Sequence, residues 1–157
     1  MPTIHLTTVI HAPLERVFDL SRSITLHKRS MEHTKEEAIK GRTSGLIEYN
    51  ETVTWQARHL GKLRELTTKI TAMQKCGYFC DEMTEGPFRE FRHEHHFKEI
   101  DNATIAIDVL DFSIPYGKLG EWFNKLYLSR YMKKLLQVRN ATIKDFAESE
   151  KWRVVLD

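Results

Sequence analysis

The sequence has little cysteine and no long apolar segment. Its two cysteines, Cys76 and Cys80, are four residues apart, and in an extended stretch this places them about 13 Å apart, beyond the reach of a disulfide. No apolar run approaches the roughly 18 residues of a membrane span. The start, MPTIHLTTVIHAPLE, lacks the basic and apolar regions of a secretory leader. We therefore expect a cytoplasmic protein without membrane insertion.

The chain also lacks an excess of charge of either sign. Lys and Arg number 24 against 22 Asp and Glu, a net charge of +2, and the basic residues are scattered. Nucleic acid is therefore not an expected partner. With 41% hydrophobic and 29% charged residues in 157, the composition is that of an ordinary globular protein. We expect one domain over residues 1–157.

What is abundant is strand-like sequence broken by turn signals. Ile4, Leu6, Thr8 and Ile10 alternate with more polar neighbours, as in a half-buried strand. The segment after Pro13 has the spacing of one or two short helices. Turn residues then separate a further series of segments, which indicates an antiparallel meander. The predicted strands are 3–11, 35–40, 46–58, 63–74, 78–84, 88–98 and 103–113.

The last part of the chain predicts one long helix. Residues 119–148 contain no Gly or Pro beyond Gly120, and apolar residues recur at helical spacing. About 30 residues span about 45 Å, enough to cross a whole sheet. Because the sheet must bury one face, we expect an α+β fold in which the sheet curls around this helix. Large rings on the helix favour an internal cavity. The predicted stripe is Leu119, Trp122, Phe123, Leu126, Tyr131, Leu135, Val138, Thr142 and Phe146.

The stretch FRHEHHF, residues 91–97, is the most unusual feature. Strand alternation turns His93 and His95 inward with the phenylalanines and leaves His96 outside. A hairpin centred on residues 99–102 predicts three cross-strand pairs, and the turn at 85–87 predicts that three residues of the preceding strand share the face. The pairs are Asp108 with His93, Ala106 with His95 and Leu110 with Phe91, and the three residues are Phe79, Asp81 and Met83.

This inward patch has three interpretations. It is a buried histidine–carboxylate network that only satisfies itself, or the polar end of an apolar ligand pocket. Alternatively, it is a metal or acid–base site, because a His-x-His pair places two ligands on one side of an ion. No nucleophile stands in a recognisable catalytic spacing. We predict neither a metal nor another cofactor.

Five stretches of the chain resemble the SRPBCC (START-like, pollen-allergen-like) superfamily, and in particular its small bacterial polyketide cyclase-like members. The most specific pieces are D-x-M-x-x-G-P-F at 81–88, H-x-H-x-F at 93–97 and P-Y-G-x-L-G at 115–120. The resemblance implies a helix-grip fold, with about seven antiparallel strands curled around a long C-terminal helix and two short helices between strands one and two. It also implies a cavity for lipids, polyketides or other apolar molecules.

By position, the resemblance places twelve residues around this cavity. Two hypotheses follow: binding of a hydrophobic or amphipathic small molecule, or a cyclase, dehydratase or hydrolase with His93 as general base and Asp108 or Asp81 holding its tautomer. A third is a partner module or homodimer that uses the outer face of residues 105–109. The expected cavity residues are Trp55, Phe79, Asp81, Met83, Phe91, His93, His95, Asp108, Leu110, Trp122, Phe123 and Leu126.

Overall fold

The computed structural model describes residues 3–115 and 117–156, with only the backbone of residues 121, 124 and 125. Within these residues one antiparallel sheet has the strand order β1-β7-β6-β5-β4-β3-β2. Its strands are β1 (Thr3–Ile10), β2 (Glu37–Gly41), β3 (Thr52–His59), β4 (Lys62–Gln74), β5 (Tyr78–Glu85), β6 (Glu90–Ile100) and β7 (Ala103–Ser113). The predicted meander is confirmed, because each strand from β2 to β7 pairs with the next.

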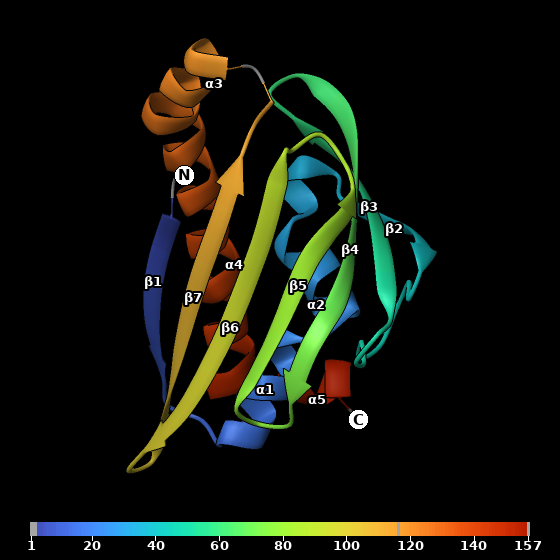
Figure 1. The fold of residues 1–157 in the computed structure, drawn as a ribbon. Helices are drawn as coiled ribbons and strands as arrows, with labels where there is room; N and C mark the ends of the chain where they lie inside the picture. Colours follow the sequence, from blue (N-terminus) through green and yellow to red (C-terminus); the bar gives the residue numbers. More distant parts are fainter. Residues whose placement is uncertain (1–2, 116, 157) are drawn as a thin grey trace.

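Helices cover one face of this sheet (Figure 1). The two short helices between the first two strands are α1 (Leu14–Ser21) and α2 (Ile24–Ser30), followed by the 3-10 turn η1 (Glu32–Thr34). The C-terminal part consists of α3 (Gly117–Phe123), a π-helical segment η2 (Asn124–Leu128), α4 (Ser129–Glu148) and α5 (Trp152–Leu156). Bulges in β2 and β4 bend the strands around α4. This is the predicted α+β helix-grip arrangement.

Strand β7 shows why these residues form a two-faced sheet. In ATIAIDVLDFS the alternate residues Thr104, Ala106, Asp108, Leu110 and Phe112 are buried. The residues between them, including Ile105, Ile107 and Val109, are partly exposed on the outer face. The alternation follows the period of two of a strand. A dimer across the outer face stays a prediction.

The predicted register of the β6–β7 hairpin is wrong by two residues. His93 pairs with Leu110 and His95 pairs with Asp108, whereas we expected Asp108 opposite His93. The turn is tighter than assumed, because Ile100 pairs directly with Ala103 and Asp101 has a left-handed φ of 52°. A shift of two residues keeps every side chain on its face. The inward set is therefore unchanged.

The C-terminal helix is not the single regular helix that the sequence predicts. The π-helical segment η2 interrupts it between α3 and α4. An i to i+5 segment holds about one residue more than an α-helical turn, which rotates the residues on either side relative to one another. The buried face of α4 accordingly contains Leu136, Arg139, Asn140, Ile143 and Phe146. Only Phe146 of this set belongs to the predicted stripe.

Candidate functional site

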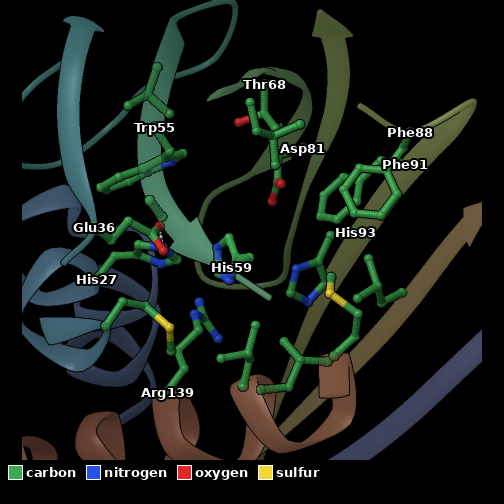
Figure 2. Close-up of a pocket in the computed structure, with 18 of the residues that line it drawn as sticks. His27, Glu36, Trp55, His59, Thr68, Asp81, Phe88, Phe91, His93 and Arg139 are labelled. Atoms are coloured by element: carbon green, nitrogen blue, oxygen red, sulfur yellow. Dashed lines mark hydrogen bonds and ion pairs between the residues drawn. The ribbon is translucent and has the colours of Figure 1, made fainter. Parts of the chain in front are cut away.

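A cavity of about 330 Å³ lies between the inner face of the sheet and the C-terminal helices. Its volume is near the lower end of the range of small-molecule sites, about 300 to 1,000 Å³. Members of two apolar core clusters contribute to its wall, and Figure 2 shows Trp55 on one side and Phe88 and Phe91 on another. The cavity is therefore apolar over most of its surface. Polar side chains converge on it at a few points.

The inward face of β6 supplies the first polar group. The Nε2 atom of His93 lies 2.8 Å from Oδ1 of Asp108, and Nε2 of His95 lies 2.7 Å from Oδ2 of Asp81. The two imidazole rings lie 3.7 Å apart, and His95 also stacks on Phe79 at 4.0 Å. His93, His95 and Asp108 are buried, while Asp81 is partly exposed and lines the cavity. We call these four residues the His–Asp cluster.

Helix α4 completes this cluster from the opposite side. Asn140 donates from Nδ2 to Oδ2 of Asp108 at 2.7 Å, and Nη1 of Arg139 lies 3.7 Å from Oδ1 of Asp108. Arg139 also donates to the carbonyl oxygen of Ser21 and to the side chain of Asn140. A buried guanidinium and a buried carboxylate thus join the helix to the sheet. Neither helix residue is predicted from the sequence, since a buried arginine and a buried asparagine interrupt the apolar stripe.

The ionisation of the cluster follows from these contacts. Burial alone would raise the pKa of Asp108, but hydrogen bonds from His93 and His95 and the charge of Arg139 outweigh it, and its pKa lies well below 3.8. Burial alone would likewise raise the pKa of Asp81, but the hydrogen bond from His95 outweighs this effect, and the pKa of Asp81 is lowered. Burial and then His95 lower the pKa of His93, despite Asp108. Near neutral pH both carboxylates are charged and His93 is neutral.

The positions of the protons also follow from geometry. A neutral His93 that donates from Nε2 to the charged Asp108 keeps its basic lone pair on Nδ1. His95 differs, because its Nδ1 lies 3.3 Å from Asp108 while its Nε2 contacts Asp81. The cluster thus combines a base, His93, with a carboxylate, Asp81, that reaches the cavity.

A second polar group lies on the side of the cavity formed by α2 and β3. Nε2 of His27 lies 2.7 Å from Oε1 of the buried Glu36, and the ring of His27 packs against Trp55 at 4.4 Å. Nearby, Nδ1 of His59 lies 2.7 Å from the hydroxyl of Tyr131, which joins β3 to α4. Burial lowers the pKa of His59. Figure 2 shows His27 and Glu36 across the cavity from His93.

The structure places eight of the twelve expected residues on the cavity wall: Trp55, Phe79, Asp81, Phe91, His93, His95, Leu110 and Phe123. Asp108 lies behind the wall, where it contacts His93. Met83 is not among the lining residues; it pairs with Thr68 next to an irregularity in the β4–β5 register. Trp122 and Leu126 are exposed, and their prediction as cavity walls is wrong. Trp122 lies just before the π-helical segment η2 and Leu126 lies within it, where the spacing of side chains differs from that of a regular α-helix.

Three residues of the His–Asp cluster also have the composition of a metal site. Donor atoms of Asp81, His93 and His95 lie within 4.8 Å of one another, and two imidazoles with one carboxylate suit zinc or iron. Both Nε2 atoms, however, already contact carboxylates that are charged. A metal ion would have to displace these protons and would lie near the guanidinium of Arg139. The geometry therefore favours a proton-filled cluster over a metal centre.

Comparison with known proteins identifies the fold. No protein-family model matches the chain, and no curated protein sequence matches it significantly. Solved structures do match. A protein from Thermus thermophilus has a TM-score of 0.74 and 17% identity, covering 92% of this chain and 95% of its own. A START superfamily protein from Mycobacterium smegmatis has a TM-score of 0.71 and 10% identity, covering 93% and 97%.

A plant protein shares the architecture too. The ginseng major latex-like protein 151 from Panax ginseng matches with a TM-score of 0.69 and 13% identity, covering 94% of this chain and 98% of its own. The predicted SRPBCC resemblance is thereby confirmed at the level of the fold. None of the described helices is both long and apolar enough to cross a bilayer.

Proposed function

We propose that this chain, which has the START-like helix-grip fold, binds an amphipathic small molecule in the cavity between its sheet and α4. The observation that carries the proposal is a cavity of about 330 Å³ with apolar walls and converging polar side chains. Ligand sites have this composition, in which apolar contacts supply affinity and a few polar groups fix orientation. A START superfamily protein and a major latex-like protein share the fold, which supports the same class of function by analogy.

The His–Asp cluster suggests which polar group the ligand carries. Asp81 lines the cavity, is charged, and uses Oδ2 for its hydrogen bond to His95. A second carboxylate, Asp108, lies 3.3 Å from the other ring nitrogen of His95. A ligand hydroxyl or phenol would donate to Asp81, whereas an ionised ligand carboxylate has no proton to donate to it. We therefore propose a neutral, hydroxylated and largely apolar ligand.

A cavity-filling substitution tests the proposal. Leu135 lies on α4, lines the cavity and is partly exposed, so Leu135→Trp places a larger ring where there is space for it. We expect binding of an environment-sensitive apolar dye, measured by fluorescence titration, to weaken at least about tenfold, the order of effect of excluding one ring-sized group. The matched control is Val154→Trp on the exposed face of α5, which should bind normally.

A second measurement searches for the natural ligand. Native mass spectrometry of protein purified from its own host should show a retained mass that Leu135→Trp lacks. If Leu135→Trp and Val154→Trp bind the dye equally and neither differs from the parent protein, the cavity is not the binding site and the proposal is wrong.

One observation favours a second candidate, an enzyme of proton transfer. His93 is neutral, lines the cavity, and is oriented by a hydrogen bond to Asp108, which is the arrangement of a general base. Because the pKa of His93 is lowered, its activity would be constant at neutral pH and lost as the pH falls through that pKa. Turnover of a polyketide-like substrate should vanish in His93→Gln with dye binding intact. Turnover that survives this substitution would exclude the role.

A further inference from the structure

Two elements at the mouth of the cavity expose large apolar side chains. On α3 and η2 these are Leu119, Trp122, Phe123, Leu126 and Tyr127, which are between 39% and 76% exposed. The turn between β3 and β4 adds Leu60 and Leu63, which are 50% and 60% exposed. We call these seven residues the apolar rim. Exposed apolar groups of this size and number usually mark an interaction surface.

The rim surrounds the entrance to the cavity. Phe123 and Leu60 belong to the rim and also line the cavity, so the mouth lies between the β3–β4 turn and α3. Figure 1 shows both elements at the same end of the molecule, opposite the end that holds α1 and α5. Phe123 and Tyr127 stack at 5.9 Å, which gives the helical part of the rim an ordered aromatic surface.

Most of the charged residues around the rim are basic. On the helical side, the described residues include four exposed basic ones, Lys118, Arg130, Lys133 and Lys134. The turn, RHLGKLR at 58–64, contains three further basic residues and no acidic one. The rest of the chain therefore has a net negative charge, since the net charge of the whole chain is only +2. Apolar and aromatic residues flanked by Lys and Arg are typical of surfaces that lie on anionic lipid.

We propose that the apolar rim docks on the surface of an anionic lipid bilayer, with the mouth of the cavity facing the lipid. Trp122 and Tyr127 would lie at the headgroup level and the leucines below it, while the basic side chains contact lipid phosphates. The docking itself depends only on the rim; the further idea that ligand enters the cavity from the bilayer rests on the proposed function. No spanning helix is needed for this role.

The same charges argue against a second copy of the chain as the partner. In a symmetric dimer each rim would face the identical rim, so basic residues would lie opposite basic residues. Like charges placed opposite one another oppose association. An anionic bilayer instead complements the rim in both its apolar and its basic parts.

Vesicle binding tests the proposal. The protein should sediment with vesicles of phosphatidylglycerol and phosphatidylcholine but bind vesicles of phosphatidylcholine alone at least about tenfold more weakly, and 0.5 M salt should release it. Brominated lipid should quench tryptophan fluorescence, and this quenching should fall in Trp122→Phe, because Trp55 is buried and Trp152 belongs to α5, which lies at the other end of the molecule (Figure 1).

Matched variants locate the contact. The double variants Trp122→Ser with Leu126→Ser, and Leu60→Ser with Leu63→Ser, should each weaken binding to anionic vesicles at least about tenfold. Tyr49→Ser, which removes an exposed aromatic side chain outside the rim, should have no effect. Circular dichroism confirms that each variant is folded.

Three results would overturn the docking proposal: equal binding to both kinds of vesicle, binding to neither, or rim variants that bind like the parent protein. Concentration-dependent dimers that the rim variants abolish would likewise replace the bilayer with a second copy. The proposed ligand function fails separately, since it predicts dye binding in vesicle-free solution by the parent and by the variant Trp122→Ser with Leu126→Ser alike, because neither of these residues lines the cavity. Loss of dye binding with intact vesicle binding would remove that function and leave docking standing.

Discussion

The most informative single substitution is Asp108→Asn, because Asp108 is where β7, β6 and α4 meet. The carboxylate is 3% exposed, accepts hydrogen bonds from His93 and Asn140, and lies 3.7 Å from Arg139. The amide has nearly the same shape, but it removes the charge that balances Arg139. It also presents one N–H donor toward groups that are themselves donors.

The expected loss of stability is large. Removing one partner of a buried ion pair typically costs about 3 to 5 kcal/mol, because the other charge remains buried without compensation. We expect urea unfolding at pH 7 to show a decrease of this size for Asp108→Asn. The control is Asp145→Asn, whose carboxylate is 56% exposed and pairs with Lys151 on the surface. Surface pairs contribute about 0 to 1 kcal/mol, so this variant should be nearly as stable as the parent.

The difference in stability between the parent protein and Asp108→Asn should depend on pH in a definite direction. The pKa of Asp108 in the folded protein lies well below 3.8, so its charge stabilises the fold at every pH above the unfolded value. That contribution is lost as the pH falls from the unfolded pKa through the folded one. The difference between parent and Asp108→Asn should therefore stay constant down to about pH 4 and shrink below it.

A double-mutant cycle shows whether the charges act as a unit. Arg139→Met removes the opposing cation, and the combined variant should be more stable than the sum of the two single losses predicts, by about 1 to 3 kcal/mol. Strict additivity, or an Asp108→Asn variant within about 1 kcal/mol of the parent, would contradict the network derived from the contacts of Asp108. A gap that grew on acidification would contradict the direction of its pKa shift.

Two further predictions concern the cavity mouth and a backbone position. His59→Phe and Tyr131→Phe each remove the hydrogen bond between β3 and α4, so stopped-flow dissociation of a bound dye should be several times faster, with at most about 1.5 kcal/mol lost in urea unfolding. Gly41→Ala should be clearly more destabilising than Gly61→Ala: both glycines have positive φ, but a Cβ on Gly41 would lie 2.2 Å from the carbonyl oxygen of Thr52, whereas nothing lies within 4 Å at Gly61. Equal losses for the two glycines would contradict the close approach.

The sheet was predictable because its signals are local. Alternation in β1, β6 and β7 assigns each side chain to a face, and turn residues separate the strands. His93 and His95 were placed on the inner face in spite of a register error of two residues, since faces repeat with a period of two. The predicted contact between His93 and Asp108 is also present, although the two residues are diagonal neighbours and not a direct cross-strand pair. The role of these residues in binding stays a prediction.

The C-terminal helix was less predictable because its buried face is mixed. Arg139 and Asn140 occupy central positions that a sequence pattern assigns to apolar residues. Their partners, Asp108 and the carbonyl oxygen of Ser21, lie far away in the sequence. The π-helical segment has no signal of its own in the sequence. Without it, Trp122 and Leu126 would continue the stripe toward the sheet.

The polar cluster at one end of the cavity and the apolar rim at the other imply an order for ligand entry. Arg139 is about 24 Å along the helix from Phe123 if each of the 16 intervening steps rises 1.5 Å. The His–Asp cluster faces Arg139, so it lies at the closed end, while the apolar rim lies at the mouth. A ligand oriented by Asp81 must therefore enter with its hydroxyl group first and leave its apolar part toward the rim. In a bilayer, an amphipathic molecule holds its polar group nearest the surface and its apolar part below it. A protein docked on that surface would therefore receive the hydroxyl end of the molecule first.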